Sequence, residues 1–396
     1  MLSGLAGGLS TSHNPFQIKQ CTASPEVAGL GCVKHLIHPH PLLPTPLPYL
    51  QGVKLSKADF HRHDAQPGEL ELLRQIRART ARAAAGGVRL GIGDDCALIR
   101  PRGGEELAVT TDLSIAGRHF RLDWHPPEAI GHRTLARGLS DLAAMGARPV
   151  AAFLSLGLPK ELIRRTGHKT AWIDRFYDGF LALADAHNTP LAGGDLAESP
   201  VAAADIVLIG AVLRGKALLR SGARPGDQLY VTGSLGGAAV GIARLAELAS
   251  AAKDRKLKIP RELEAVLAPH LYPQPRIGQG LWLMRRGLAT AALDISDGLS
   301  TDLHHLCEES GVAAEVEAAG LPVSPGATLE QALHGGEDYE LLFTAGPNAR
   351  LPRAIAGVPV TRIGHIVRRR AGRPAITLRT GDSTHPLRAR GWEHFA

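Results

Sequence analysis

Hydrophobic and polar positions divide the chain into an irregular first stretch and a long regular remainder. Residues 1–66 carry proline-rich runs such as Pro44-Thr-Pro-Leu-Pro48 and show no steady hydrophobic period, as is typical of a segment without a packed core. We interpret this stretch as a loose tail or as sequence translated from a misplaced start codon. The alternative is metal binding by its histidines, which are His35, His38, His40, His61 and His63.

From Pro67 onward the hydrophobic period alternates between helical and strand spacing. Pro67-Gly-Glu-Leu70 opens a predicted helix whose apolar side carries Leu70, Leu73, Ile76 and Thr80 and which ends at Gly86-Gly87. Further helices are predicted over 128–145, 160–187 with a break near 167, 238–249, 262–267, 277–286 and 298–310. Strands are predicted over 88–92, 106–111, 150–158, 190–191, 205–213, 228–232, 291–295 and at the end of 335–343.

The sequence of elements begins again near residue 214, and each half mixes strands with helices. Such a succession predicts an α/β protein with mixed sheets in two domains. We predict an N-terminal domain over 67–213 and a C-terminal domain over 214–396, preceded by the extension over 1–66.

Composition narrows the classes of function. Aromatic residues make up only 4% of the chain, so the cores must rest on aliphatic side chains; the net charge is +7. No stripe of Lys and Arg with interleaved aromatics is present, so we expect phosphorylated small molecules rather than nucleic acid as ligands. The four cysteines form no CxxC pair, which favours a reducing cytoplasm. No apolar stretch long enough for a membrane span and no secretory signal is found.

Acidic residues beside glycine or small residues recur along the chain. Asp94 and Asp95 follow Gly91-Ile-Gly93, Asp112 follows Thr110-Thr111, and Asp195 follows a Gly-Gly pair interpreted as a turn that could face an anion. Each of these could instead be an ordinary turn or strand end. Together they predict several Mg²⁺ ions, because this hard cation takes oxygen ligands and several phosphates need several cations.

Two acidic sites carry more weight. Asp141 follows Ser140 inside an apolar helix, where a carboxylate is costly unless it is paired or metal-bound. Asp294 and Ser296 share one face in extended geometry, and Asp297 lies near a helix N-terminus, where phosphate is favoured. The Gly233–Gly237 loop lacks the lysine of a P-loop and is interpreted as a packing turn. No catalytic triad or activated cysteine is evident, so we expect no covalent nucleophile and no catalytic base.

The chain resembles the thiamine-monophosphate kinase family. The motifs that carry the resemblance span about residues 67–396 and include Gly91-Ile-Gly-Asp-Asp-Cys-Ala-Leu98, Leu139-Ser-Asp-Leu-Ala-Ala-Met-Gly-Ala147, Gly193-Gly-Asp195, Asp294-Ile-Ser-Asp-Gly-Leu299 and Gly335-Gly-Glu-Asp-Tyr-Glu-Leu341. The resemblance implies ATP-dependent phosphorylation of thiamine monophosphate to thiamine diphosphate. It also implies the aminoimidazole ribonucleotide synthetase-like fold and a homodimer formed through the strands of the N-terminal domain.

The resemblance also implies roles for particular residues. Metal binding falls to Asp95, Thr110, Thr111, Asp112, Asp141, Asp195, Asp294 and Asp297. ATP contacts fall to Tyr177, Gly194, Arg220 and Ser296, and contacts to the thiamine substrate to His119, Glu337 and Trp392. One departure concerns Leu196-Ala-Glu-Ser-Pro200, where the family often has Thr-Thr-Arg-Gly-Pro: the arginine and hydroxyls that could contact a phosphate are lost there, and the acid Asp195 remains. The alternatives are another ATP-using enzyme of this fold, such as a selenophosphate synthetase, or a non-catalytic ATP- and magnesium-binding paralogue.

Overall fold

The computed structural model describes residues 69–80, 87–92, 96–164, 171–252 and 257–392. Contacts join the chain from Arg62 to Ala396 into one compact unit. The interpretation of residues 1–66 and the role of Asp95 fall outside the described residues. Within the described part the architecture is α/β with mixed sheets, as predicted.

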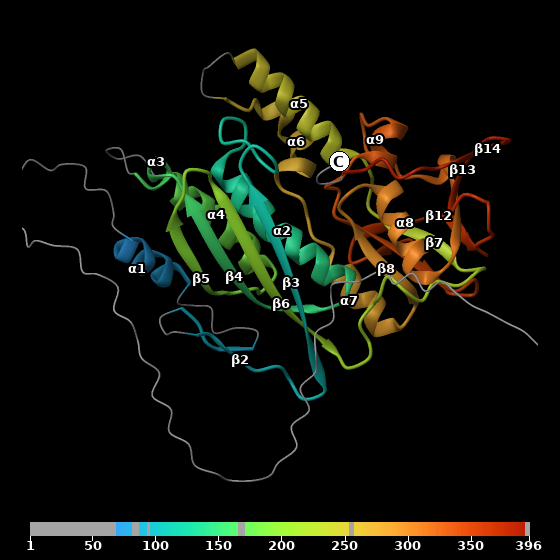
Figure 1. Cartoon of the computed structure of the whole chain (residues 1–396), viewed down its shortest axis with the longest axis horizontal. Helices are drawn as coiled ribbons and strands as arrows, with labels where there is room; N and C mark the ends of the chain where they lie inside the picture. The colour runs from blue at the N-terminus through green and yellow to red at the C-terminus, as the bar shows by residue number, and fades with distance from the viewer. Residues whose placement is uncertain (1–68, 81–86, 93–95, 165–170, 253–256, 393–396) are drawn as a thin grey trace, which may run out of the picture. The chain divides into compact units, whose positions relative to one another are not determined.

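The first sheet has four long strands side by side, and its order is β3-β6-β4-β5 (Figure 1). β6 pairs antiparallel with both β3 and β4, whereas β4 and β5 are parallel. The strands are β3 (Glu105–Ile115), β4 (Arg148–Leu158), β5 (Leu191–Glu198) and β6 (Ala203–Leu213). A small antiparallel pair, β1 (Val88–Leu90) and β2 (Leu98–Ile99), packs with Val150 and Ala151 of β4.

Helix α2 (Pro127–Ala144) is the element on which the site depends, because it contacts the first sheet and the second. It is buried along most of its length. Glycines bring its neighbours close: a Cβ on Gly179 of α4 (Trp172–Ala186) would lie 1.9 Å from a carbonyl oxygen of α2. The same holds for Gly280 of α7 (Ile277–Arg286), which crosses α2 at Ala143. These crossings fix α2 as a rigid support for the side chains it carries.

The second sheet has the order β14-β13-β9-β12-β7-β10-β8, with β11 added beside β12. Its strands are β7 (Gln228–Thr232), β8 (Ala289–Ile295), β9 (Ala313–Glu317), β10 (Glu340–Ala345), β11 (Ala354–Ile355), β12 (Val358–Val367), β13 (Ile376–Thr380) and β14 (Ser383–Pro386). Leu299, Leu303 and Leu306 of α8 (Leu299–Ser310) pack against this sheet in its own aliphatic core. The remaining helices are α1 (Glu69–Thr80), α3 (Lys160–Ile163), α5 (Gly237–Ala252), α6 (Glu264–Leu271) and α9 (Leu329–His334), with 3₁₀ turns at Arg261–Leu263 and Ala318–Gly320.

Most predicted elements in the described part are confirmed, and three details are wrong. In α1 Leu72 is buried, whereas Leu73, which was expected on the apolar side, is exposed. The predicted Gly193-Gly194-Asp195 turn is part of strand β5 and pairs with β4 throughout. The break within 160–187 is wider than predicted, because α3 ends at Ile163 and α4 begins at Trp172. The domain boundary near residue 214 stays a prediction. No helix in the described part of the chain has the length and apolar character of a membrane span.

Candidate active site

A cavity of about 660 Å³ is lined by acidic, basic and aromatic side chains from both halves of the chain. That volume suits a small-molecule ligand. The lining residues are Thr111, Asp112, Arg118, His119, Arg137, Asp141, Ala238, Ala239, Ile242, His270, Asp294, Ser296, Asp297, Gly335, Gly336, Glu337, Tyr339 and Trp392. The structure therefore brings nine of the residues named by the family motifs to one place, although they lie as far as 281 positions apart in the chain.

The cavity is lined by a pair of carboxylates, of which Asp294 is buried and Asp141 is half-buried. Asp141 of α2 accepts a hydrogen bond from Thr110 Oγ1 at 2.5 Å, and Asp294 of β8 accepts one from Ser140 Oγ at 2.7 Å. Burial, followed by the neighbouring charge of Asp294, raises the pKa of Asp141 to about 7. Burial also raises the pKa of Asp294. Two acids that are withdrawn from water and repel each other form a site that favours a cation.

Asp112 of β3 has a cationic partner already. Arg137 NH2 of α2 lies 2.6 Å from Asp112 Oδ1, and its NH1 donates to Ser114 Oγ at 3.2 Å. Burial raises the pKa of Asp112 in spite of this arginine, and the charge of Asp297 contributes. Residues 110 and 111 are neighbours on one strand, so their side chains point to opposite faces of the sheet. Only the Thr110 hydroxyl reaches Asp141.

The end of β8 and the start of α8 form the opposite wall. Ser296 and Asp297 line the cavity there, and the Trp392 backbone N–H donates to the Asp297 carbonyl at 3.1 Å. Beneath them Asp302 Oδ2 accepts the N–H groups of Asp297 and Gly298. Burial, with Asp294 and Asp297 nearby, nevertheless raises the pKa of Asp302 to about 8. This wall is therefore held by backbone hydrogen bonds to a side chain that the sequence did not single out.

The donor set fits Mg²⁺, because it is made of carboxylate and hydroxyl oxygens around a repelling pair. Among the described residues no three His, Cys, Asp or Glu side chains gather closely enough to hold a metal ion by themselves. This fits the habit of Mg²⁺, which binds one or two carboxylates and completes its shell with water and substrate phosphates. Arg220 also acts on this pair, since its charge lowers the pKa of both Asp141 and Asp294 against the effect of burial.

The loop from Gly335 to Tyr339 enters the cavity in a strained conformation. Glu337 has φ 66° and Tyr339 has φ 50°, left-handed values that non-glycine residues seldom adopt. Between them Asp338 accepts the N–H groups of Gly236 at 2.7 Å and Ala238 at 3.3 Å. The start of α5 is therefore capped by Asp338, which supports the interpretation of the Gly233–Gly237 loop as a packing turn.

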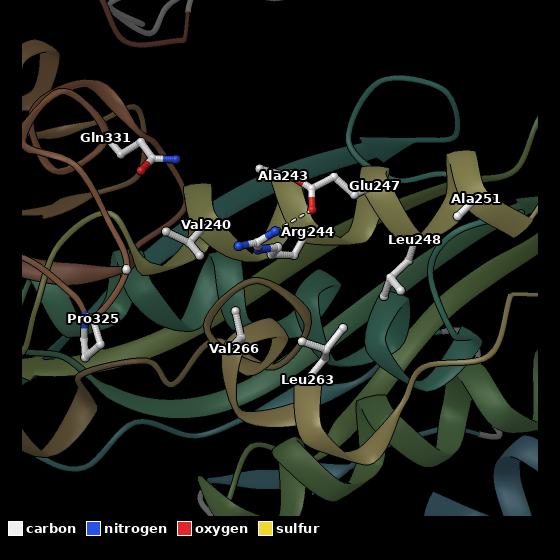
Figure 2. A pocket seen from close by; sticks show the side chains of 11 residues that line it. Val240, Ala243, Arg244, Glu247, Leu248, Ala251, Leu263, Val266, Pro325 and Gln331 are labelled. Atoms are coloured by element: carbon white, nitrogen blue, oxygen red, sulfur yellow. Dashed lines mark hydrogen bonds and ion pairs between the residues drawn. The ribbon is translucent and has the colours of Figure 1, made fainter.

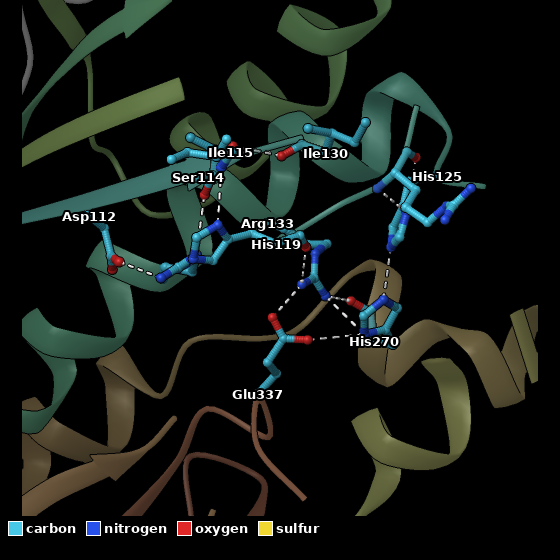
Figure 3. Close-up of polar contacts among 12 residues, drawn as sticks. Asp112, Ser114, Ile115, His119, His125, Ile130, Arg133, His270 and Glu337 are labelled. Carbon is cyan, nitrogen blue, oxygen red and sulfur yellow. Dashed lines mark hydrogen bonds and ion pairs between the residues drawn. The ribbon is translucent and has the colours of Figure 1, made fainter. Parts of the chain in front are cut away.

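Glu337 lies in a polar cluster that sequence reasoning missed (Figure 3). Its Oε1 lies 2.5 Å from Arg133 NH2 and its Oε2 lies 3.3 Å from His270 Nδ1. Burial alone would raise the pKa of Glu337, but Arg133 and His270 outweigh it and hold that pKa far below its usual range. Arg133 and His270 come from elements 137 positions apart, so no local motif could reveal them. His119 also lies nearby, since its carbonyl accepts from Arg133 at 3.4 Å.

Three motif residues lie elsewhere, in a pocket of about 430 Å³ beside β5. Tyr177 of α4 and Gly194 and Asp195 of β5 line it. Tyr177 is only 5% exposed, and burial raises its hydroxyl pKa. Gly194 has φ 151°, and a Cβ there would lie 1.9 Å from the Leu154 carbonyl oxygen. The Gly-Gly pair thus permits two strands to approach closely, which is why it is not a turn.

A third hollow, of about 780 Å³, runs along α5 and contains no motif residue (Figure 2). Val240, Ala243 and Leu248 of α5 line it opposite Leu263 and Val266. Its ion pair, between Arg244 and Glu247, is exposed and joins neighbours on one helix. With so few converging polar groups, this hollow does not provide a phosphate site.

Comparison with known proteins identifies the family of this chain. Residues 93–215 match the profile of the AIR synthase related protein, N-terminal domain, and residues 224–376 match that of the C-terminal domain. Over 345 residues the chain is 38% identical to a thiamine-monophosphate kinase of Escherichia coli (strain K12), which covers 83% of this chain and 98% of that protein. The chain belongs to the thiamine-monophosphate kinase family.

Solved structures of this family have the same fold. The thiamine-monophosphate kinase from Stenotrophomonas maltophilia K279a is 38% identical, covers 78% of this chain and 96% of that chain, and gives a TM-score of 0.66. AaThiL complexed with AMPPCP and TMP is 29% identical, covers 85% of this chain and 100% of that chain, and gives a TM-score of 0.61. The family and the fold expected from the sequence motifs are confirmed.

Proposed function

We propose that this chain transfers the γ-phosphoryl group of ATP to thiamine monophosphate and so forms thiamine diphosphate and ADP. The observation that carries the proposal is the gathering of the family's acidic motifs around one cavity, in a chain 38% identical to a thiamine-monophosphate kinase over nearly that protein's whole length. The relative complexed with AMPPCP and TMP supports the two substrates.

In the proposed reaction, a phosphate oxygen of thiamine monophosphate attacks the γ-phosphorus of ATP in line with the leaving oxygen of ADP. One P–O bond forms and one breaks, and no covalent enzyme intermediate is needed. The attacking phosphate is already largely ionised, because its second pKa is about 6. The protein's part is therefore positioning and charge compensation rather than proton removal.

Magnesium would be held by the acidic walls of the cavity. We assign Asp141, Asp294, Asp112 and Asp297 to this role, with Thr110, Thr111, Asp195 and Asp95 as the further members implied by the family. When bound, Mg²⁺ neutralises charge on the phosphates. The repulsion within the Asp141–Asp294 pair supports this assignment, since a cation relieves it.

The substrates divide over the remaining motif residues. We assign His119, Glu337 and Trp392 to thiamine monophosphate, whose fixed thiazolium charge suits an ionised carboxylate and an aromatic face. Ser296, Arg220, Tyr177 and Gly194 are assigned to ATP. Because Tyr177 and Gly194 line the pocket beside β5 and Ser296 lines the main cavity, one ATP can use all of them only by extending from one to the other.

The family's homodimer is part of the proposal. β3 is an edge strand, and one of its faces presents Leu107, Val109 and Leu113 with exposures of 45%, 61% and 49%. An exposed edge strand with an apolar face favours pairing with another chain. We expect Val109→Asp to give a monomer in light scattering where the wild-type protein is a dimer; Leu73→Asp, at an exposed leucine of α1, serves as a control of equal charge change. A dimer that survives Val109→Asp would exclude this face as the interface.

The activity is tested by incubating the purified protein with ATP, Mg²⁺ and thiamine monophosphate and separating the thiamine species by chromatography. Thiamine diphosphate that appears in step with ADP, and only with magnesium, is the expected result. ADP without thiamine diphosphate would indicate another acceptor and overturn the proposed substrate. ATP binding without ADP would indicate a non-catalytic paralogue.

A further inference from the structure

Two buried histidines continue the polar cluster behind Glu337 (Figure 3). His270 of α6 is 2% exposed, and His125, which precedes α2, is 4% exposed. Their Nε2 atoms lie 3.0 Å apart, and His270 Nδ1 faces Glu337 Oε2 at 3.3 Å. The three side chains therefore form a row that runs from the protein interior to the cavity wall.

The backbone sets the direction of the hydrogen bonds in this row. The N–H of Arg121 lies 3.1 Å from His125 Nδ1, and a backbone N–H can only donate, so Nδ1 must accept. In a neutral ring the proton of His125 is then on Nε2, which donates to Nε2 of His270. His270 in turn carries its proton on Nδ1 and donates it to Glu337. The backbone amide of Arg121 thus determines the tautomer of His270, which is two hydrogen bonds away.

Both rings are neutral in the physiological range. Burial, then the charge of Arg133, lowers the pKa of His125 to about 3 and that of His270 to about 4. The opposite set of tautomers would use the contact of His125 Nδ1 with the Arg121 carbonyl at 3.2 Å and that of His270 Nδ1 with Arg133 NH1 at 3.1 Å. That set removes the acceptor of the Arg121 amide and one donor of Glu337. The first set is favoured because in the second the Arg121 N–H would face the protonated Nδ1 of His125 at 3.1 Å. Without His125, Arg133 NH1, a donor that faces His270 Nδ1 at 3.1 Å, would instead favour the Nε2–H tautomer of His270.

We propose that His125 is a positioning residue for the substrate site, which acts by holding His270 in the Nδ1–H tautomer that donates to Glu337. The carboxylate then has a fixed donor on each oxygen, Arg133 on one and His270 on the other. Its orientation toward the cavity is set before the substrate arrives. The inference rests on the proposed function in one respect, the assignment of Glu337 to thiamine monophosphate.

The tautomer is tested directly by nitrogen-15 NMR of histidine-labelled protein, because the two ring nitrogens differ in shift when one is protonated. His270→Gln identifies the signal of His270. We expect Nδ1–H in the wild-type protein, Nε2–H in His125→Phe and Nδ1–H again in His125→Gln, whose amide restores a donor. His132→Phe is the matched control, because His132 is also buried and bridges α2 to the chain after α6, through the Pro273 carbonyl at 2.8 Å. Nε2–H in the wild type, or Nδ1–H retained in His125→Phe, would overturn the proposal.

Binding of thiamine monophosphate, measured by calorimetry, tests the consequence. Loss of a hydrogen bond to a charged group predicts that His125→Phe weakens the affinity by about 10- to 100-fold, with partial recovery in His125→Gln. The affinity for ATP should stay unchanged, as should both affinities in His132→Phe. Equal affinity in wild type and His125→Phe would refute the positioning role. Failure of the proposed function would give a different result, in which the wild-type protein does not bind thiamine monophosphate. In that case the tautomer of His270, measured by NMR, alone decides whether His125 positions it.

Discussion

Replacing Asp141 by Asn should stabilise the magnesium-free protein at high pH, although it removes a residue that we assign to metal binding. Asp141 has an unfolded-state pKa of 3.8, and in the folded protein burial and then Asp294 raise its pKa to about 7. The folded state therefore binds this proton more tightly than the unfolded state does. Its contribution to stability is favourable at low pH and is lost as the pH rises from about 4 to about 7.

The size of the effect follows from the pKa difference. About 3 pKa units, at about 1.4 kcal/mol each, correspond to about 4 kcal/mol of penalty for the ionised acid. Asparagine has the same shape and no charge, and it changes one hydrogen bond, with Thr110, at a cost of about 1 kcal/mol. We therefore expect Asp141→Asn to exceed the wild-type free energy of unfolding by about 3 kcal/mol at about pH 8, and to fall slightly below it at about pH 4.

The assay is urea denaturation of both proteins at the two pH values, with a chelator and without nucleotide. Asp178→Asn is the control, because Asp178 is 56% exposed in a surface ion pair with Arg79; we expect the two pH values to give the same small difference for it. Adding Mg²⁺ should stabilise the wild type more than Asp141→Asn, and turnover of the variant should fall by at least about tenfold. The reasoning is refuted if Asp141→Asn shows the same difference from wild type at both pH values.

Two further predictions concern charges and packing around the site. Arg137→Met leaves Asp112 without its cation, so the magnesium-free protein should lose about 2 kcal/mol of stability while its affinity for Mg²⁺, measured by calorimetry, rises; weaker Mg²⁺ binding would show that this arginine does not compete with the metal. Gly194→Ala forces a Cβ to within 1.9 Å of a carbonyl oxygen on the neighbouring strand and should lower the free energy of unfolding by about 3 kcal/mol. Gly91 lines the same pocket, and a Cβ there would make only an ordinary contact, at 3.8 Å from the Ala192 carbonyl oxygen. Gly91→Ala should therefore behave as wild type in the same urea series.

The acids of the site could be predicted from the sequence because each breaks a local pattern. Asp141 interrupts an apolar helix, and Asp294 ends an apolar strand, so both can be picked out as candidate site residues without knowledge of the fold. The basic residues around them do not show in this way. Arg133 and Arg137 lie in the same helix as Asp141 and look like ordinary polar positions, and nothing nearby in the sequence indicates that Glu337 and Asp112 will meet them.

The errors in the predicted fold have similar physical causes. Gly193-Gly194 has the composition of a turn, and only the approach of β4 to within contact of Gly194 explains why a strand needs glycine there. The strands after residue 350 were not predicted, because β11 and β14 are short and the Val358–Val367 strand carries only a weak alternation of polar and apolar residues. The longer ones are stabilised by pairing with strands earlier in the chain, β12 with β7 and β9 and β13 with β9, while β11 and β14 only pair with their neighbours β12 and β13.

The carboxylates of the cavity differ in how their charge is compensated, and this difference separates their proposed roles. Glu337 is compensated by the protein itself, through Arg133 and His270, so it is ionised and fixed whether or not a ligand is present. Asp141 and Asp294 accept side-chain hydrogen bonds from the hydroxyls of Thr110 and Ser140 and repel each other, and Arg220 offsets the effect of burial only in part, so most of their charge is left for a ligand to compensate. A cation that binds this pair offsets the unfavourable free energy of burying the two charges. Cation binding is therefore strongest under the conditions in which these charges most destabilise the cation-free fold. On this reasoning the proposed substrate site around Glu337 should tolerate a change of pH that alters the proposed metal site, because Glu337 has its counter-charges within the fold.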